Sequence, residues 1–201
     1  MLQHIRPAIV LIILMTLLTG VIYPFAITGF AAVVFPHRAG GSMLMRDGNV
    51  IGSSLIGQNF TSDKYFHGRP SATNMPDPND PTKTVDAPYN GANSSGSNLG
   101  PTSQTLIDRV KADVENWRKA GVTGPIPADA VTTSGSGLDP NISPAFARLQ
   151  IARVAKARGL SEEKVQALVA SAVEGRTLGL VGEPRVNVLE LNLALDALPA
   201  S

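Results

Sequence analysis

Residues 7–35 read PAIVLIILMTLLTGVIYPFAITGFAAVVF, and this stretch sets the architecture of the whole chain. It carries no charged side chain, and no polar face interrupts it. A helix needs about 20 apolar residues to cross the hydrocarbon core of a membrane. The sequence therefore predicts one membrane-spanning helix from Ala8 to about Phe25, with a continuation to Phe35. Pro24 lacks a backbone donor and is expected to bend this helix.

A cleaved signal peptide is the alternative interpretation of this segment. Arg6 would form its basic region, and Phe30-Ala31-Ala32 would offer small residues for cleavage. The apolar core of a signal peptide has about 7–15 residues, and this one is about twice as long, which favours a retained anchor. Charge leaves the orientation open, because Arg6 precedes the segment and Arg38 and Arg46 follow it. We divide the chain into an N-terminal segment with one transmembrane helix, 1–36, and a soluble domain, 37–201.

The composition of the 201-residue chain excludes several classes of function. The formal net charge is +1, so no basic surface for nucleic acid is expected. Cysteine is absent, which excludes disulfides, thiolate metal sites and cysteine nucleophiles. His4 and His37 flank the apolar segment, and His67 is interpreted as an exposed loop residue. A lone histidine lacks further ligands or an ordered acid and nucleophile, so no metal site and no catalytic residue is predicted.

The soluble part mixes strand and helix signals, which predicts a mixed α/β (α+β) fold. Asp47-Gly48 predicts a hairpin between Met43–Arg46 and Asn49–Ile51. A helix is predicted over residues 104–119, because four apolar residues recur there with helical spacing. These residues are Leu106, Val110, Val114 and Trp117.

The C-terminal third is predicted to hold three helices. Ser143-Pro144 is typical of a helix start and Gly159 of a helix end. A second helix is predicted over residues 161–175, with acidic residues in its first turn. The last segment, VNVLELNLALDAL, alternates like a strand. Asn187 with Glu190 matches a capping box, however, and leucine and alanine favour helix, so we predict a helix there.

Two long stretches, residues 68–103 and 121–142, are rich in Gly, Pro, Ser, Asn and Asp. The composition of the first favours disorder, although loops of this length are otherwise functional. Gly91 to Gly96 has the spacing of a phosphate-binding loop, but Ser97 stands at its lysine position and Asn98 at its Ser/Thr position. A structural turn is favoured, and backbone amides that bind an anion stay an alternative. Three charged residues beside Gly or Pro are interpreted as bridges between loops: Arg69, Glu183 and Arg185.

Several strings occur together in collinear order over nearly the whole chain. They are GSSLIGQNF (52–60), YFHGRPSA (65–72), YN (89–90), SSGSNLGP (94–101), VTTSGSGLDPNISP (131–144), RVA (153–155) with Arg158, and GEPRVNVLELN (182–192). Each string alone is weak, but the ordered set resembles the KdpC family, the C subunits of bacterial potassium-transporting Kdp ATPases. The family usually has Gly-Gly at Ser95-Gly96 and often His at Asn141, so the loop geometry is expected to differ at these positions.

The resemblance implies a non-catalytic subunit of an ATP-driven, high-affinity potassium uptake complex. Such a subunit is expected to stabilise assembly and to support ATP binding and use by the P-type subunit, as a catalytic chaperone. The implied partners are a channel-like potassium-translocating subunit, a P-type ATP-hydrolysing subunit and a very small membrane peptide. ATP and K+ are then ligands of the complex, and no cofactor is expected to be held firmly by this chain.

The resemblance also implies a location and a set of candidate residues. The chain would lie in the bacterial inner membrane, with its N-terminus cytoplasmic and its soluble domain periplasmic. A nucleotide-binding loop is the hypothesis for Ser95, Gly96, Ser97 and Asn98. Partner contacts are the hypothesis for Gly20 and Gly29 in the span and for Arg69, Asn98 and Arg185 in the soluble domain. The alternative is a stand-alone membrane-anchored periplasmic binding module; an anchored hydrolase lacks an ordered nucleophile, base and acid.

Overall fold

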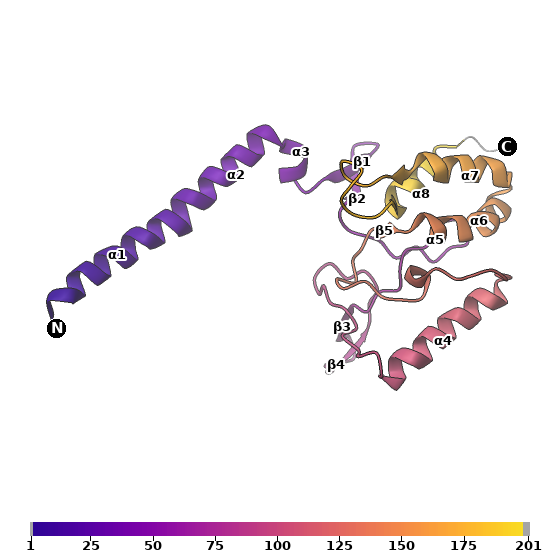
Figure 1. Ribbon diagram of the computed structural model, residues 1–201, viewed down its shortest axis with the longest axis horizontal. Helices are drawn as coiled ribbons and strands as arrows, with labels where there is room; N and C mark the ends of the chain where they lie inside the picture. The colour runs from indigo at the N-terminus through magenta and orange to yellow at the C-terminus, as the bar shows by residue number, and fades with distance from the viewer. Residues whose placement is uncertain (1, 199–201) are drawn as a thin grey trace. The chain divides into compact units, whose positions relative to one another are not determined.

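The computed structural model of the chain describes residues 2–198 (Figure 1). The chain divides into two compact units, residues 1–53 and 54–201, and each is described by itself. The described residues form both helices and sheets, which confirms the mixed fold. The hairpin that follows residue 36 belongs to the first unit. The division at residue 36 between an anchor segment and a soluble domain stays a prediction.

A continuous helical segment dominates the first unit and confirms the predicted helix. A short 3-10 turn, Leu2–His4, precedes α1 (Ile5–Leu17), a π-helical turn (Leu18–Ile22), α2 (Tyr23–Val34) and the short α3 (Pro36–Ala39). The helical segment Ile5–Val34 has 30 residues, and an 18-residue stretch within it has a mean hydropathy of 2.4 and is unburied. In length and composition this helix can cross a membrane.

The helix changes its hydrogen-bond pattern just before Pro24. Proline has no N–H, and its ring crowds the carbonyl four residues earlier, which belongs to Gly20. A wider π-helical turn, Leu18–Ile22, accommodates the proline, and α2 follows with Pro24 in its first turn. A π-helical turn is a recognised site of helix bending, but the bend at Pro24 itself stays a prediction.

The Asp-Gly hairpin forms as predicted. Strands β1 (Met43–Arg46) and β2 (Asn49–Ser53) pair antiparallel, so the second strand is two residues longer than expected. Asp47 and Gly48 both have positive φ, +53° and +80°. A two-residue turn of this hand needs positive φ at both central positions, which Asp and Gly tolerate best.

The second unit combines strands and helices, and its last element is a helix. A hairpin of β3 (Asn74–Asp77) and β4 (Asp80–Asp86) is followed by α4 (Gln104–Lys119), a 3-10 turn (Ala128–Ala130), β5 (Asn141–Ile142), α5 (Pro144–Leu149), α6 (Ile151–Arg158), α7 (Glu162–Ser171), β6 (Val173–Glu174), β7 (Arg185–Asn187) and α8 (Val188–Asp196). The last three strands form an antiparallel sheet in the order β5-β7-β6. The β3–β4 hairpin corrects the expectation of disorder for this part of residues 68–103.

Two predicted helix starts are confirmed by hydrogen bonds from their capping side chains, but one predicted helix is divided into two and another ends early. The Ser143 hydroxyl accepts from the Phe146 amide at 3.0 Å, and the Asn187 side chain accepts from the Glu190 amide at 3.1 Å, so the last segment is helical. One helix was predicted up to Gly159, whereas the structure has two, α5 and α6, which meet at Gln150. Helix α7 ends at Ser171, because the following residues pair as β6.

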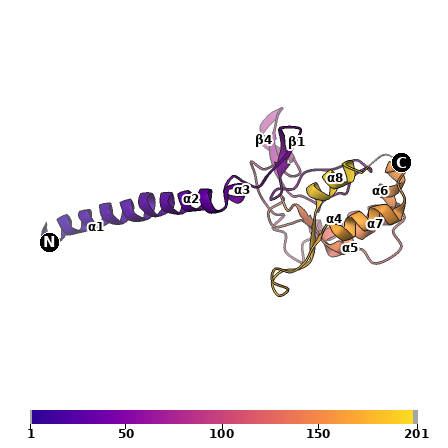
Figure 2. The same ribbon diagram turned by 90° about the horizontal axis from the view of Figure 1, so that it is seen from above.

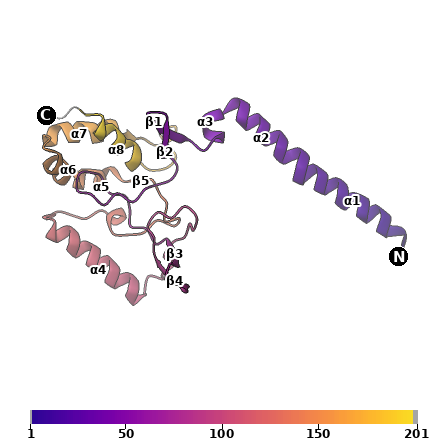
Figure 3. The same cartoon turned by 180° about the vertical axis from the view of Figure 1, so that it is seen from behind.

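The core of the second unit lies among α5–α8, the three-stranded sheet and an extended segment at Phe66. Fully or almost fully buried apolar side chains include Phe66, Phe146, Val154, Val165, Val186, Leu191 and Leu195. Helix α4 lies apart from α5–α8 of the same unit (Figure 3), and its predicted apolar face is half-buried. Trp117 joins α4 to the core, because its ring meets Phe146 edge-on at 5.5 Å and its Nε1 donates to the Ala130 carbonyl.

Candidate functional site

Two buried side-chain amides hold the extended segment around Phe66 against the helices. The Asn192 Oδ1 accepts from the Phe66 amide at 2.8 Å, and its Nδ2 donates to the Phe66 carbonyl at 3.0 Å. Gln150 does the same for His67, at 2.8 and 3.0 Å. Gln150 is fully buried and Asn192 nearly so. Buried backbone N–H and C=O groups need hydrogen-bond partners. Each side-chain amide supplies both partners for one residue of the segment, as a neighbouring strand would in a sheet.

Two arginines of α6 fix the same segment from its outer side. Arg153 donates to the carbonyls of Asp63 and Tyr65 at 2.8 and 3.0 Å. Arg158 forms an ion pair with Asp196 at 2.6 Å and lies 4.8 Å from the centre of the Tyr65 ring. The Tyr65 hydroxyl also donates to Asp196. Both guanidinium groups therefore make contacts within the chain, although the Arg153 Nε is buried without a hydrogen-bond partner.

His67 is half-buried, so its interpretation as a simply exposed loop residue is wrong. Its Nε2 lies 3.1 Å from the Ser62 carbonyl oxygen. Burial, and secondly the charge of Arg153, lower the pKa of His67 from its ordinary value of 6.5. The ring is therefore neutral at neutral pH and contributes to packing of the segment.

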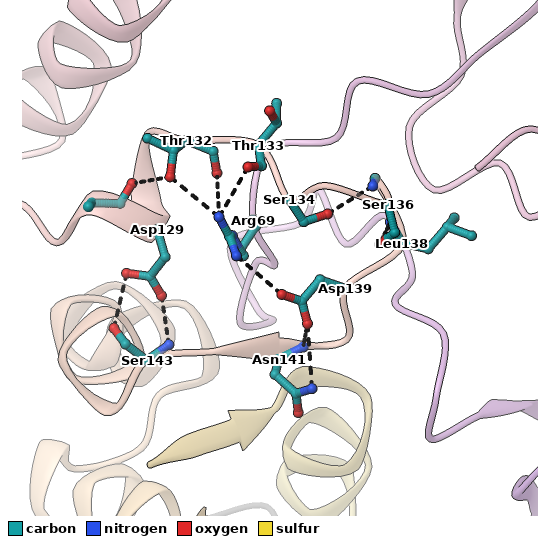
Figure 4. Close-up of polar contacts among 12 residues, drawn as sticks. Arg69, Asp129, Thr132, Thr133, Ser134, Ser136, Leu138, Asp139, Asn141 and Ser143 are labelled. Carbon is teal, nitrogen blue, oxygen red and sulfur yellow. Dashed lines mark hydrogen bonds and ion pairs between the residues drawn. The ribbon is translucent and has the colours of Figure 1, made fainter. Parts of the chain in front are cut away.

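Arg69 bridges two loops that are distant in sequence (Figure 4). Its Nη1 pairs with Asp139 Oδ2 at 3.2 Å, and its Nη2 donates to the Thr133 carbonyl at 3.1 Å and the Thr132 carbonyl at 3.4 Å. The side chain is 24% exposed, and its Nε is buried without a hydrogen-bond partner. The structure confirms the predicted loop bridge at this residue.

Two carboxylates organise the polypeptide next to this bridge. Asp139 uses its second oxygen to accept from the Asn141 amide at 3.0 Å, at the start of β5. Asp129 accepts from both the amide and the hydroxyl of Ser143, at 2.6 and 3.0 Å (Figure 4). The Arg69–Asp139 pair thus holds the first residue of β5, and Asp129 holds the N-cap residue of α5.

Tyr89 is a further residue that holds these loops together, and its backbone is in the left-handed region with φ of +61°. Its hydroxyl donates to the Arg69 carbonyl at 2.8 Å, and its amide donates to the Ser71 hydroxyl at 3.0 Å. Ser71 in turn donates to the Gly137 carbonyl at 2.8 Å. Burial raises the pKa of Tyr89 to about 12, which keeps its hydroxyl a donor. A Cβ at Gly68 would overlap this hydroxyl.

The predicted nucleotide loop packs on the same region. The Ser95 amide donates to the Ser136 carbonyl at 2.9 Å, and the Ser94 hydroxyl donates to it at 3.0 Å. A Cβ at Gly96 would lie 2.8 Å from the Gly135 carbonyl oxygen, so the two backbones are in close approach. At least one amide that an anion would need therefore has a partner within the chain. Nucleotide binding here stays a prediction.

The other candidate residues lie at separate places. Ser97 is half-buried near Thr133, whereas Asn98 is exposed with φ of +50°. Arg185 on β7 pairs with Glu174 on β6 at 2.9 Å, and Glu183 pairs with Arg176 at 2.9 Å. Both pairs lie within the β6–β7 hairpin, so the predicted bridges between separate loops are not formed at these two residues.

Gly20 and Gly29 lie on the unburied helical segment of the first unit. A Cβ at Gly29 would meet nothing within 4 Å, and one at Gly20 only the Thr16 methyl group at 4.0 Å. Their faces are therefore open to another helix, and their role in partner contact stays a prediction.

Sequence reasoning missed the residues that organise the second unit most strongly, Gln150, Asn192 and Tyr89. A signal existed for Asn192, since it stands among the leucines of LELNLAL, in a segment for which a helix was predicted. A polar residue at such a position needs a partner, and that partner is the Phe66 backbone.

The described residues 2–198 hold no candidate metal centre, and two cavities among them are open to solvent. Within residues 2–198 no group of three or more His, Asp or Glu side chains can hold a metal ion. An open cavity of about 590 Å³ is lined by Arg153 and Lys156 of α6 together with Asp63 and Ala120. A smaller one of about 240 Å³ has Arg185 and Glu174 in its lining. The described chain is thus organised around loop-to-loop contacts.

These features define a class of protein: a small mixed α+β domain of interlocked loops on a chain with one helix able to cross a membrane. Comparison with known families agrees, because the model of the family described as K+-transporting ATPase, c chain (KdpC), matches residues 5–197. The chain belongs to the KdpC family. That family places it among the accessory subunits of a potassium-transporting ATPase rather than as the catalytic chain.

Relatives cover almost the full chain. The potassium-transporting ATPase KdpC subunit of Methylobacterium nodulans is 64% identical over 198 residues, which cover 98% of each chain. The KdpC subunit of Bradyrhizobium diazoefficiens is 63% identical over 98% of each chain. That of Rhodopseudomonas palustris strain BisB18 is 62% identical over 98% of this chain and 99% of its own.

Proposed function

We propose that this chain is a non-catalytic subunit of an ATP-driven, high-affinity potassium uptake complex and that it stabilises the assembled complex. The family match over residues 5–197 carries the proposal. The loop cluster around Arg69 supports it, because the Arg69 guanidinium is used to hold another loop through Asp139 and the carbonyls of Thr132 and Thr133. A rigid domain of this kind is suited to presenting a fixed surface to partners.

The location follows from the same proposal: one span in the bacterial inner membrane, with the N-terminus cytoplasmic and the soluble domain periplasmic. The absence of cysteine allows a direct test. Lys83→Cys, at a side chain that is 72% exposed, will react with an impermeant maleimide in intact spheroplasts. Gln3→Cys will react only after the membrane is permeabilised. The reverse pattern would contradict this orientation.

The proposed partners are a channel-like potassium-translocating subunit, a P-type ATP-hydrolysing subunit and a very small membrane peptide. Gly20 and Gly29 offer places where a neighbouring helix backbone can approach closely. A tagged chain co-expressed with these subunits is expected to recover them in mild detergent. The double variant Gly20→Leu with Gly29→Leu will reduce the recovery of these subunits, whereas the control Ile12→Leu will not. A tagged wild-type chain recovered alone would favour the stand-alone binding module.

Support of ATP binding and use by the P-type subunit, as a catalytic chaperone, is the finer part of this proposal. ATP and K+ are ligands of the complex and not cofactors of this chain. A direct role for residues 95–98 is tested with a photoreactive ATP analogue on the assembled complex. Direct contact with ATP is supported if the analogue labels this chain and if Ser97→Ala and Asn98→Ala reduce that labelling. If only the P-type subunit is labelled, the support acts through assembly.

A further inference from the structure

A hairpin between β6 and β7 presents an apolar tip to solvent. Leu178 is 90% exposed, Leu180 81% and Val181 67%. Figure 2 shows this connection as the gold loop that stands away from the helices. Single exposed apolar side chains are ordinary on protein surfaces, but three within four residues at one protruding tip form a patch.

The tip is held in one conformation by the residues below it. The Thr177 amide donates to the Val181 carbonyl at 2.9 Å, and the Val181 amide donates back to the Thr177 carbonyl at 3.0 Å. The Arg176 Nη2 lies 2.9 Å from both carboxylate oxygens of Glu183, across the two arms of the hairpin. A tip that is already ordered loses little conformational freedom when it binds.

Leu178 also has an unfavourable backbone conformation, with φ of +54°. A bulky residue in this region is uncommon, and glycine or asparagine would occupy it with less strain. Nothing within the chain compensates, because the leucine side chain is almost fully exposed. The backbone strain lowers the stability of the isolated fold and the exposed side chain offsets none of it, so a contact outside the chain is its physical justification.

We propose that the tip formed by Leu178, Leu180 and Val181 docks into an uncharged apolar pocket of another subunit of the same potassium-transporting complex, outside the bilayer. This inference rests on the proposed function. The tip is too small to hold two free proteins together, but a chain anchored in the same membrane as its partner binds at high effective concentration. A small, ordered apolar tip is sufficient under that condition.

Charge and size separate this occupant from two others. Residues 173–187 contain two basic and two acidic side chains, which form ion pairs, and no aromatic residue. A loop that binds lipid headgroups would be expected to have a basic excess or Trp and Tyr at its edge. A second copy of the chain is disfavoured because these tips alone would have to hold the two copies together. A stable protein interface buries about 800 Å² on each side, far more than three side chains supply, whereas a subunit of the complex is also held by the proposed contacts at the span.

The test uses the tagged full chain co-expressed with the other subunits. Leu178→Ser with Leu180→Ser is expected to lower their recovery after detergent washing by about tenfold, the factor that one good apolar contact contributes. The matched control is Met75→Ser with Val85→Ser, a cross-strand pair of exposed apolar residues on the β3–β4 hairpin. This control should recover the complex as the wild type does.

A second variant separates docking from folding. Leu178→Asn relieves the backbone strain, so its unfolding midpoint should equal or exceed that of the wild type while recovery of the other subunits still falls. A photoreactive amino acid at Leu180 should form an adduct with another subunit. Adducts only with lipid or with a second copy would overturn the inference, as would full recovery with the double serine variant. If the wild-type chain itself recovers no subunit, the proposed function fails.

Discussion

Asn192 and Phe66, separated by 126 positions in sequence, share two hydrogen bonds in the buried centre of the second unit. The Asn192 side chain serves both polar groups of the Phe66 backbone, while the Phe66 ring is itself fully buried. One asparagine thus satisfies a peptide that would otherwise lie unpaired in the core. This relationship joins the N-terminal loops of the unit to its last helix.

Replacement of Asn192 by leucine is expected to destabilise the fold strongly. The variant leaves the Phe66 amide and carbonyl buried without partners, and each such group costs about 1–3 kcal/mol. We therefore expect a loss of about 2–5 kcal/mol in the free energy of unfolding. Urea unfolding of the full chain in detergent measures it, with the exposed Glu163→Gln as control. A loss below that of the control would show that the pairing is dispensable.

Arg69→Lys tests the loop bridge. Lysine keeps the charge but lacks the planar fork that contacts Asp139 and the carbonyls of Thr132 and Thr133. We expect faster amide hydrogen exchange over residues 132–139 and a loss of about 1–2 kcal/mol in unfolding free energy. Lys83→Ala, which breaks an exposed pair with Asp80, should change neither. Equal exchange in the two variants would contradict the bridge.

Gly137→Ala tests the close approach of the loops, with Gly121→Ala as its control. Both glycines have positive φ, +67° and +91°, so both alanines carry a conformational cost of about 1–2 kcal/mol. At Gly121 a Cβ meets nothing within 4 Å, whereas at Gly137 it would lie 2.7 Å from the Ser95 carbonyl oxygen. Only Gly137→Ala should lower the unfolding midpoint well beyond this shared cost. Similar midpoints would show that the loops can separate freely.

His67 predicts a pH dependence of stability. Its pKa in the folded chain lies below 6.5, so the folded state binds fewer protons than the unfolded state as the pH falls. The stability linked to this residue is complete above about pH 6.5 and is lost as the pH falls through the lower folded pKa. His67→Asn should therefore lose less stability than the wild type between pH 7.5 and pH 5.5. The exposed His37→Asn is the control, and parallel losses in all three proteins would refute the prediction.

Local sequence patterns predicted those elements whose signals are themselves local. Asp47-Gly48 specified its turn by backbone preference, and Ser143 and Asn187 specified helix starts by capping. The break at Gln150 was missed, because the helical pattern continues through it. That residue ends α5 so that its side chain can reach the His67 backbone, which is a long-range requirement.

The turn-rich segments show the same limit. Composition favoured disorder for residues 68–103, because these residues contain too little apolar surface to fold alone. Ser71, Tyr89 and Ser95 instead bond to a second turn-rich loop, residues 132–139, and to each other. A composition measured in one segment cannot include hydrogen bonds supplied by another.

The sequence by itself determined the apolar helix, most of the other helices and the family, because these depend on hydropathy, capping and ordered strings of residues. Only the tertiary structure decided which polar side chains are committed within the chain and which surface is left for partners. Arg69 proved to be a bridge, and Leu178 proved to be almost fully exposed at the tip of a hairpin. The physical reason is that burial and hydrogen-bond pairing are properties of segments brought together, and no single segment specifies its partner.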